Sequence, residues 1–376
     1  MSASLHPSFF QPRDRRVLLG LLLLTALGFS CLFFEIYRRF YPSPDYGAFW
    51  QSTRDWLAGA PPYGLKQTPG TDMGRATFAY PFLALLFLTP FALFPLPSSV
   101  ALWTGISVTI YCSFPWLLRF QRPLIVALGS LLYFPLWMAI EQAQWSLVLT
   151  AIGGLIVALY AEHPFWSGLL IPLLLLKPQV GIGLVCGLLA FNLPRNKSHY
   201  WIGALTGVGI WWGGTLLFRP TWPSEWLALL QSLSRNEVLR LSYAYPYQTP
   251  GFGIGICGLL VGALLLALYR RHAAALCITT TLTVLMVSPL RVYDYLVLYV
   301  PLLVLLRHVE QKQVAHTGEA AVLPLYQSAP ILLMGGFAAI SWLTVIGGGL
   351  GLGLTGIFLS SVLPLVVGAL VLLSWL

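Results

Sequence analysis

Long apolar segments alternate with short polar linkers along almost the whole chain. A helix needs roughly 17–25 apolar residues to cross a bilayer, and shorter helices can pair inside a protein, so this pattern predicts about twelve transmembrane helices. The expected fold class is an all-α polytopic membrane protein, with residues 1–376 forming a single membrane-embedded domain. The predicted spans are residues 17–36, 97–118, 123–140, 144–160, 165–176, 178–193, 199–218, 251–269, 273–287, 292–307, 325–345 and 351–375.

Composition excludes a soluble globular protein. Hydrophobic residues make up 57% of the chain and charged residues only 9%, whereas soluble domains carry roughly 25% charged residues. Lys and Arg number 21 against 12 Asp and Glu. The preference of basic residues for cytoplasmic loops accounts for much of this excess, so we expect membrane lipids as neighbours and no nucleic-acid partner.

Neither the cysteines nor the N-terminal segment changes this picture. The first apolar segment ends in Glu35 without a small-residue cleavage site, which favours a retained span over a signal peptide. All cysteines lie within apolar segments and lack metal-ligand spacing, so we expect them to pack as small hydrophobic residues without disulfides. They are Cys31, Cys112, Cys186, Cys257 and Cys277.

Residues 77–95 decide the predicted topology. This apolar segment contains three prolines, which interrupt helical hydrogen bonding. If it does not cross the membrane, every short basic linker lies on the same side as the N-terminal arginines, which the positive-inside rule makes cytoplasmic. We therefore expect a re-entrant or juxtamembrane segment on the outer face of the plasma (inner) membrane, with both chain ends in the cytoplasm.

This topology places two long segments on the outer face, residues 37–96 and 219–250. The first contains a short helix after Asp45, stopped by Gly59. The second is too polar to span, but its apolar positions give it an interfacial stripe. The stripe of the first helix is formed by Tyr46, Phe49, Trp50, Thr53 and Leu57, and that of the second by Trp222, Trp226, Leu229, Leu230 and Leu233.

Ionisable side chains beside membrane spans are costly unless they are paired, hydrated or functional. Asp45 is either a helix N-cap or a general base for an acceptor hydroxyl. Lys177 interrupts two short apolar segments and either extends to the interface or binds a lipid phosphate. Arg291 and Asp294 either form a mutual salt bridge, or Arg291 makes a second phosphate contact.

Other outer-face residues are less informative. Gln142 and Gln144 lie in a turn that exposure to water alone explains. Tyr63 and Tyr80 belong to aromatic-proline segments, and tyrosine is common at membrane interfaces. The sequence offers no acidic pair with metal-binding spacing, so we expect chemistry without a metal or other cofactor.

Five segments, taken in order, are similar to those of one enzyme family. The chain resembles the polyprenyl-phosphate-mannose-dependent mannosyltransferases of glycosyltransferase family 87, in the GT-C superfamily of integral-membrane glycosyltransferases. The segments are DYGAFWQSTRDWLAGAPPYG, FAYPFLALLFLTPFALFPL, EQAQWSLVLTAIGGL, LLLLKPQVGIGL and SPLRVYDYLVLYVPLLVLL. The resemblance implies a GT-C-type helical bundle with outer-face juxtamembrane helices. It also implies inverting transfer of a hexose, such as mannose, from a polyprenyl-phosphate donor to a lipid or glycan acceptor.

The resemblance also maps three family features onto this chain. It implies that Asp45 is the general base, that the mid-chain glutamine is Gln142 or Gln144, and that the Lys-Pro turn is at Lys177. Taken with the outer-face residues, this leads us to expect that Lys177 and Arg291 bind the donor phosphate. The expected substrate-binding positions are Gln142, Gln144, Tyr63, Tyr80, Asp294 and Tyr295.

Two positions depart from the family pattern. Family members often carry histidine where this chain has Tyr295, and Gly-Gln-x-Asn is common where this chain reads Glu141 to Gln144.

The alternative function is a transporter or flippase for a lipid or polysaccharide, which would place charges at mid-membrane rather than at one face. A non-enzymatic scaffold, the third alternative, is hard to reconcile with Asp45 and Lys177 on the same side.

Overall fold

The computed structural model describes residues 12–39, 44–67, 75–192, 198–235 and 292–317, which are mostly helical. Among the short elements, η1 and η4 are 3-10 helices and η3 is a π-helix. In chain order the elements are α1 (Pro12–Arg39), α2 (Pro44–Leu57), β1 (Leu65–Gln67), β2 (Arg75–Thr77), α3 (Phe82–Ala92), α4 (Leu96–Leu117), α5 (Pro123–Leu131), α6 (Phe134–Glu141), α7 (Trp145–Tyr160), α8 (Pro164–Leu170), η1 (Ile171–Leu176), α9 (Pro178–Asn192), α10 (Ser198–Gly207), η3 (Val208–Gly213), α11 (Gly214–Phe218), α12 (Trp222–Arg235), η4 (Val292–Leu298) and α16 (Tyr299–Thr317).

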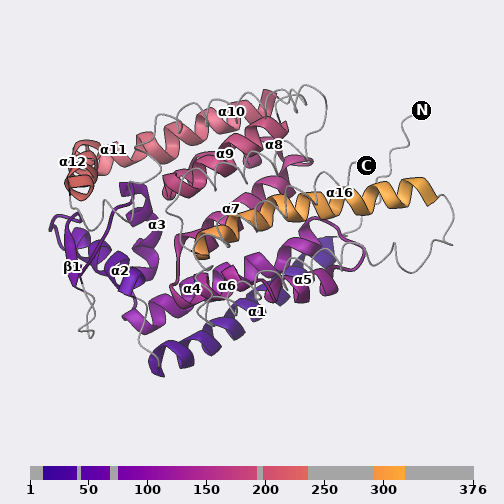
Figure 1. Ribbon diagram of the computed structural model, residues 1–376, viewed down its shortest axis with the longest axis horizontal. Coiled ribbons are helices and arrows are strands. Elements are labelled where there is room, and N and C mark those ends of the chain that lie inside the picture. Colours follow the sequence, from indigo (N-terminus) through magenta and orange to yellow (C-terminus); the bar gives the residue numbers. More distant parts are fainter. Residues whose placement is uncertain (1–11, 40–43, 68–74, 193–197, 236–291, 318–376) are drawn as a thin grey trace, which may run out of the picture.

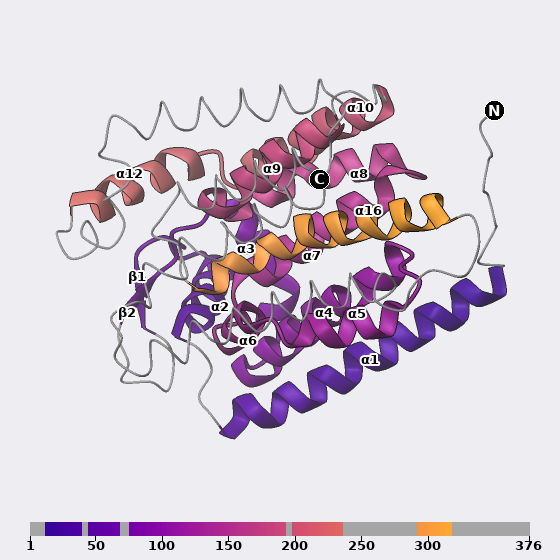
Figure 2. The same cartoon turned by 45° about the vertical axis from the view of Figure 1, so that its right-hand side comes forward.

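The long helices lie roughly along the longest axis of the molecule (Figure 1). Helices α8 to α11 form one side, α1, α4, α5 and α6 form the other, and α7 and α16 run between them. The short elements α2, α3, β1 and α12 gather at one end of this bundle, and the rotated view shows the same arrangement (Figures 1 and 2). Loops from distant parts of the sequence therefore meet at that end.

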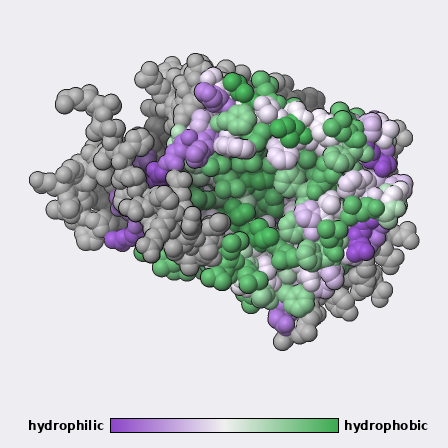
Figure 3. All heavy atoms as spheres, turned by 180° about the vertical axis from the view of Figure 1, so that it is seen from behind, coloured by the Kyte–Doolittle hydropathy of each residue, from purple (hydrophilic) through white to green (hydrophobic). Residues whose placement is uncertain are grey.

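Apolar side chains cover much of the outside of the bundle. Viewed from behind, hydrophobic residues dominate the coloured surface, and hydrophilic ones gather near its margins (Figure 3). Leu205 is 75% exposed and Leu217 is 87% exposed. Within the described residues, two helical segments are long and apolar enough to cross a membrane, Leu96–Leu117 and Ser198–Phe218. The structure is that of a membrane protein.

The predicted span 123–140 is not one straight helix. It consists of α5 and α6, which meet at an angle of 61°, and it counts as a third candidate span only if the bent pair is taken together. Pro135 in the first turn of α6 explains the break, because its nitrogen has no hydrogen to continue the ladder of α5. Four other predicted spans, 251–269, 273–287, 325–345 and 351–375, lie outside the described residues.

Residues 77–95 contain a helix of only 11 residues, α3. At 1.5 Å per residue its length is about 16 Å, roughly half the hydrocarbon thickness of a bilayer. Six of its residues are buried, including Phe82 and Leu85. The antiparallel hairpin β1–β2 precedes it, with Leu65 opposite Thr77, and was not predicted from the sequence.

Helix α2 buries the predicted face. Tyr46, Phe49, Trp50 and Thr53 are buried, whereas Leu57 at the last turn is 46% exposed. The Tyr46 hydroxyl lies 2.8 Å from Ser99 Oγ, which ties α2 to α4. The indole of Trp50 donates to the Phe94 carbonyl at 3.0 Å. The helix is thereby fixed at two positions, one turn apart, on its buried face.

Helix α2 ends where glycine permits a left-handed turn. Gly59 has φ +81°, a conformation that residues with a Cβ rarely adopt.

Candidate active site

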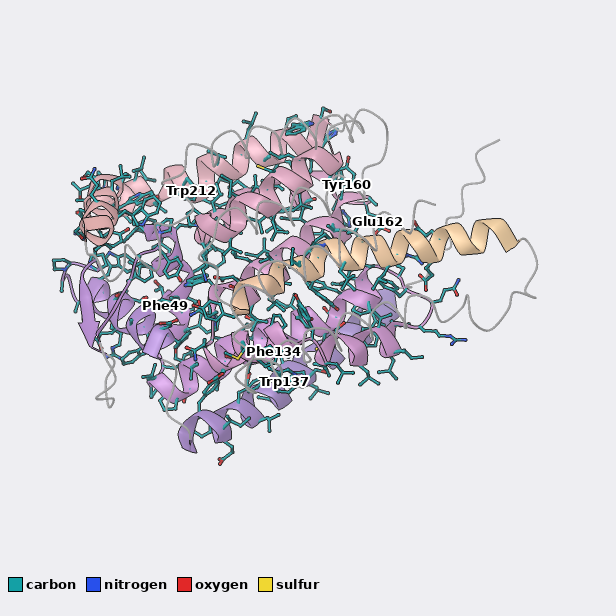
Figure 4. All side chains as sticks on the ribbon, in the orientation of Figure 1. Phe49, Phe134, Trp137, Tyr160, Glu162 and Trp212 are labelled. Carbon is teal, nitrogen blue, oxygen red and sulfur yellow. The ribbon has the colours of Figure 1, made fainter. Side chains whose placement is uncertain are left out.

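Four polar side chains from four different parts of the chain meet at the end of the bundle where α2 lies. Asp45 is in the first turn of α2, Gln144 precedes α7, Lys177 separates η1 from α9, and Asp294 is in the first turn of η4. Each residue lies where a helix begins. Phe49, one turn after Asp45, marks this end of the bundle in Figure 4.

The amide of Gln144 connects a carboxylate to an ammonium group. Its Nε2 donates to Asp45 Oδ2 at 2.5 Å, and its Oε1 lies 3.4 Å from Lys177 Nζ. The Gln144 side chain is completely buried, whereas Asp45 is half-buried. Asp45 is therefore the more accessible end of a polar chain that continues into the protein.

Lys177 and Asp294 form a buried ion pair. Nζ of Lys177 lies 2.5 Å from Oδ1 of Asp294, and the two side chains are only 3% and 4% exposed. Ser146 donates a second hydrogen bond to the same carboxylate oxygen. The Lys177 ammonium also lies 4.8 Å from the centre of the Tyr293 ring, within the range of a cation–π contact.

A strained turn places Gln144. Ala143, between α6 and α7, has φ +42°, a left-handed conformation that costs an L-residue roughly 1–2 kcal/mol. The backbone nitrogen of Gln144 donates to the Ala139 carbonyl at 3.0 Å, which closes the turn. Such strain persists only where surrounding contacts enforce it, and it is common at functional sites.

Close backbone packing places Lys177. The Lys177 carbonyl accepts hydrogen bonds from Val180 at 3.0 Å and Gly181 at 2.8 Å, at the start of α9. A Cβ on Gly181 would lie 1.6 Å from the Leu174 carbonyl oxygen of η1. The two short helices therefore approach closely only because position 181 has no side chain.

Aromatic rings adjoin the polar chain. Trp145 follows Gln144 directly, and its ring centre lies 6.2 Å from Tyr80, 6.5 Å from Phe49 and 4.8 Å from Trp103. The indole nitrogens of Trp145 and Trp103 are buried without a hydrogen-bond partner in the described part of the chain. Sugar rings stack on aromatic faces and offer hydroxyl oxygens to such donors.

Helix α12 and Tyr63 complete this end of the bundle. The indole of Trp226 donates to the Ala79 carbonyl at 3.1 Å, next to Tyr80. Burial, reinforced by the negative charge of Glu225, raises the pKa of the Tyr63 hydroxyl above that of a free tyrosine, so this hydroxyl stays protonated. Helix α12, Trp222–Arg235, is the helix predicted within residues 219–250, and residues 236–250 lie outside the described residues.

The structure therefore brings together most of the residues singled out from the sequence. Asp45, Gln144, Lys177 and Asp294 form one network, and Tyr80 lies beside it. Asp294 pairs with Lys177, a partner that the sequence-based interpretation did not consider.

Three other predicted positions lie in the neighbouring turn or outside what the structure describes. Gln142 is half-buried in the neighbouring turn. Arg291 lies outside the described residues, and the side chain of Tyr295 is likewise not described.

Three contributors were missed from the sequence. Ser146 and Trp145 belong to the same segment as Gln144, and Tyr293 adjoins Asp294 in sequence. Proximity to a predicted polar residue was the only signal that could have identified them, since serine and aromatic residues are common throughout the chain.

The opposite end of the bundle has a different character. Glu162 and Tyr160 mark it in Figure 4, and Glu162 pairs there with Arg119. A pocket of about 350 Å³ also lies there, lined by Leu159, His163, Trp166 and Leu170. It contains neither a carboxylate nor a lysine, so it does not match the chemistry of the polar network. Within the described ranges, no group of three or more His, Cys, Asp or Glu side chains could hold a metal ion.

The comparisons with known proteins agree with the character of this site. The family model described as Glycosyltransferase family 87 matches residues 78–292, more than half of the chain. The match includes Gln144 and Lys177 and ends just before Asp294, and Asp45 precedes it. No curated protein and no solved structure matches the chain. The chain belongs to glycosyltransferase family 87, and it is a membrane glycosyltransferase that acts on a sugar donor and an acceptor.

Proposed function

We propose that the protein transfers a hexose, such as mannose, from a polyprenyl-phosphate donor to a lipid or glycan acceptor, with inversion at the anomeric carbon. The observation that carries this proposal is the meeting of Asp45, Gln144, Lys177 and Asp294 at one end of the helical bundle. A carboxylate and an ammonium group close together suit a reaction that removes a proton at one point and releases a phosphate at another.

Asp45 is the proposed general base. The acceptor hydroxyl oxygen attacks the anomeric carbon and forms the new glycosidic bond, while its proton passes to the Asp45 carboxylate. The bond between the anomeric carbon and the phosphate oxygen breaks, and the polyprenyl phosphate leaves with the electron pair. One displacement of this kind inverts the configuration. The half-buried position of Asp45 suits contact with an incoming acceptor.

Lys177 is the proposed contact for the leaving phosphate. An ammonium group has three donor hydrogens, and among the described residues Asp294 Oδ1 and Gln144 Oε1 accept two of them. A third is then available for a phosphate oxygen when the donor binds. Arg291, three residues before Asp294, is the second proposed phosphate contact. It would add a second positive charge to a network that contains two carboxylates and one lysine.

The aromatic side chains and glutamines are the proposed substrate-binding surface. The half-buried Tyr80 lies beside the network with its ring centre 6.2 Å from that of the buried Trp145, and Tyr63 has a protonated hydroxyl. Gln142, Gln144, Asp294 and Tyr295 retain the substrate-binding roles predicted for them. The exclusion of water by this packed surface favours transfer to the acceptor over hydrolysis of the donor.

We further propose that the bundle is a single GT-C-type domain of about twelve transmembrane helices, located in the plasma (inner) membrane with the site on the outer face. Phe49, one turn after Asp45, and Glu162, which pairs with Arg119, lie towards opposite ends of the bundle (Figure 4). This supports the orientation, because basic linkers favour the cytoplasmic side.

The test is a transfer assay with purified protein in nanodiscs. The donors are a short-chain polyprenyl phosphate mannose and, in parallel, a nucleotide-linked mannose, and the acceptor is an extract of membrane lipids. We expect mannolipid formation from the polyprenyl-linked donor, and excess EDTA should leave it unchanged because Lys177 and Arg291 supply the positive charge. Transfer from the nucleotide-linked donor alone would overturn the proposal.

A further inference from the structure

We infer that Gln144 is a positioning residue for the proposed base. Its amide donates a hydrogen bond to the Asp45 carboxylate, accepts one from the neighbouring Lys177 ammonium group, and so holds the carboxylate in place. The inference rests on the proposed function, in which Asp45 accepts a proton. Gln144 Nε2 donates to Asp45 Oδ2 at 2.5 Å, while Oε1 of the same amide faces Lys177 Nζ at 3.4 Å. Only this orientation of the amide satisfies both neighbours, since an ammonium group cannot accept and a carboxylate cannot donate.

The backbone around Gln144 holds the amide in place. The residue is completely buried, precedes α7 directly, and follows Ala143, whose φ is +42°. Hydrogen bonds from Ala143 N to Ile140 O at 3.0 Å and from Gln144 N to Ala139 O at 3.0 Å close the turn. The Ile140 carbonyl also accepts a hydrogen bond from Tyr37 on α1. The amide is therefore presented by a turn that is strained and anchored, which is the expected property of a positioning group.

The charges around Gln144 come from each element packed against it. Asp45 approaches from α2 and Lys177 from the break between η1 and α9. Asp294 lies behind Lys177 on η4. Glu141 at the end of α6 is exposed. The neutral amide therefore lies between the Asp45 carboxylate and the Lys177 ammonium group, and Asp294 contacts the same lysine.

A neutral donor at position 144 has a chemical consequence for Asp45. A hydrogen bond to the ionised carboxylate favours its charged form, and a negative charge at the same place would favour its protonated form. Removing the donor, or replacing it by a carboxylate, should therefore shift protonation of Asp45 to higher pH. The acid side of the pH profile of kcat/KM reports that protonation.

The experiment compares Gln144→Met and Gln144→Glu in the transfer assay with polyprenyl phosphate mannose and membrane-lipid extract. We expect the acid limb of kcat/KM to move to higher pH in both variants, by about 1 unit or more for glutamate and by less for methionine. At the optimum pH of the parent, kcat/KM should fall on the order of 10–100-fold. The use of two variants keeps the inference testable if one of them does not fold.

The matched control is Gln51→Glu on α2. Gln51 Nε2 donates to Asp55 Oδ1 at 2.7 Å, the same type of bond on the same helix but outside the site. The pH profile of Gln51→Glu should equal that of the parent.

Unshifted acid limbs of kcat/KM in both Gln144 variants would overturn the inference. If Asp45→Asn is active as well, the proposed base is wrong; if Asp45→Asn is inactive, only the role of Gln144 fails.

Discussion

Lys177 Nζ lies 2.5 Å from Asp294 Oδ1, although 117 positions separate the two residues and both side chains are almost completely buried. A charged side chain in such surroundings is destabilising unless it is paired. Removal of one partner therefore leaves an uncompensated buried charge on the other. The pair therefore links the break between η1 and α9 to the start of η4.

The first prediction distinguishes the contribution of this ion pair to stability from its contribution to sugar transfer. Lys177→Met and Asp294→Asn should each lower the free energy of unfolding by about 3–5 kcal/mol, because each leaves a buried charge unpaired. The double variant removes both charges and should regain most of that loss. Thermal unfolding in detergent measures the stability.

Transfer should behave differently from stability in the double variant. If Lys177 binds the leaving phosphate, the double variant stays inactive although it is folded. A double variant that transfers sugar at the parental rate would show that the pair has no part in the reaction.

The second prediction concerns the close approach of η1 and α9. Gly181→Ala places a Cβ 1.6 Å from the Leu174 carbonyl oxygen, and neither backbone can move without displacing Lys177. We expect a loss of stability of about 1–3 kcal/mol, together with weaker binding of polyprenyl phosphate. Gly209→Ala is the control, since nothing lies within 4 Å of the Cβ it adds. Equal melting temperatures for the two variants would argue against this packing.

The third prediction tests the orientation in the membrane. In a variant without native cysteines, single cysteines at Glu141 and Thr221 should react with an impermeant maleimide added outside. Those at Gln121 and Ala161 should react only after the membrane is opened. All four positions are exposed. Outside labelling of Gln121 together with protection of Glu141 would reverse the proposed topology.

Local features of the fold could be predicted from the sequence. The buried face of α2 follows from apolar residues at helical spacing, and its end follows from Gly59. The helix near Trp222 and the short α3 were also predicted, because their signals, periodicity and proline content, lie within a few residues. The 61° break between α5 and α6 was missed although Pro135 marks it, because length and hydropathy alone favoured one span.

The candidate site could be predicted only as a group of residues on one side. Alternation of spans and basic linkers placed Asp45, Gln144, Lys177 and Asp294 together. This pattern could not predict which of these residues contact one another, because contacts between residues 99 and 117 positions apart depend on how the helices pack. Pairing of Asp294 with Lys177 therefore emerged only from the structure.

The proposed mechanism requires Asp45 to accept the proton of the acceptor hydroxyl. Asn at this position keeps the geometry: it has the same size and shape as Asp, and its carbonyl oxygen still accepts the hydrogen bond that Gln144 Nε2 donates to Asp45. It cannot accept a proton. The folded protein should therefore bind polyprenyl phosphate mannose as the parent does.

The most direct measurement is the single-turnover rate of mannose transfer by Asp45→Asn, with donor binding measured in the same preparation. We expect unchanged donor affinity and a rate lower by a factor on the order of 10²–10⁴, the usual range for loss of a general base. A rate equal to that of the parent, at equal donor occupancy, would contradict it.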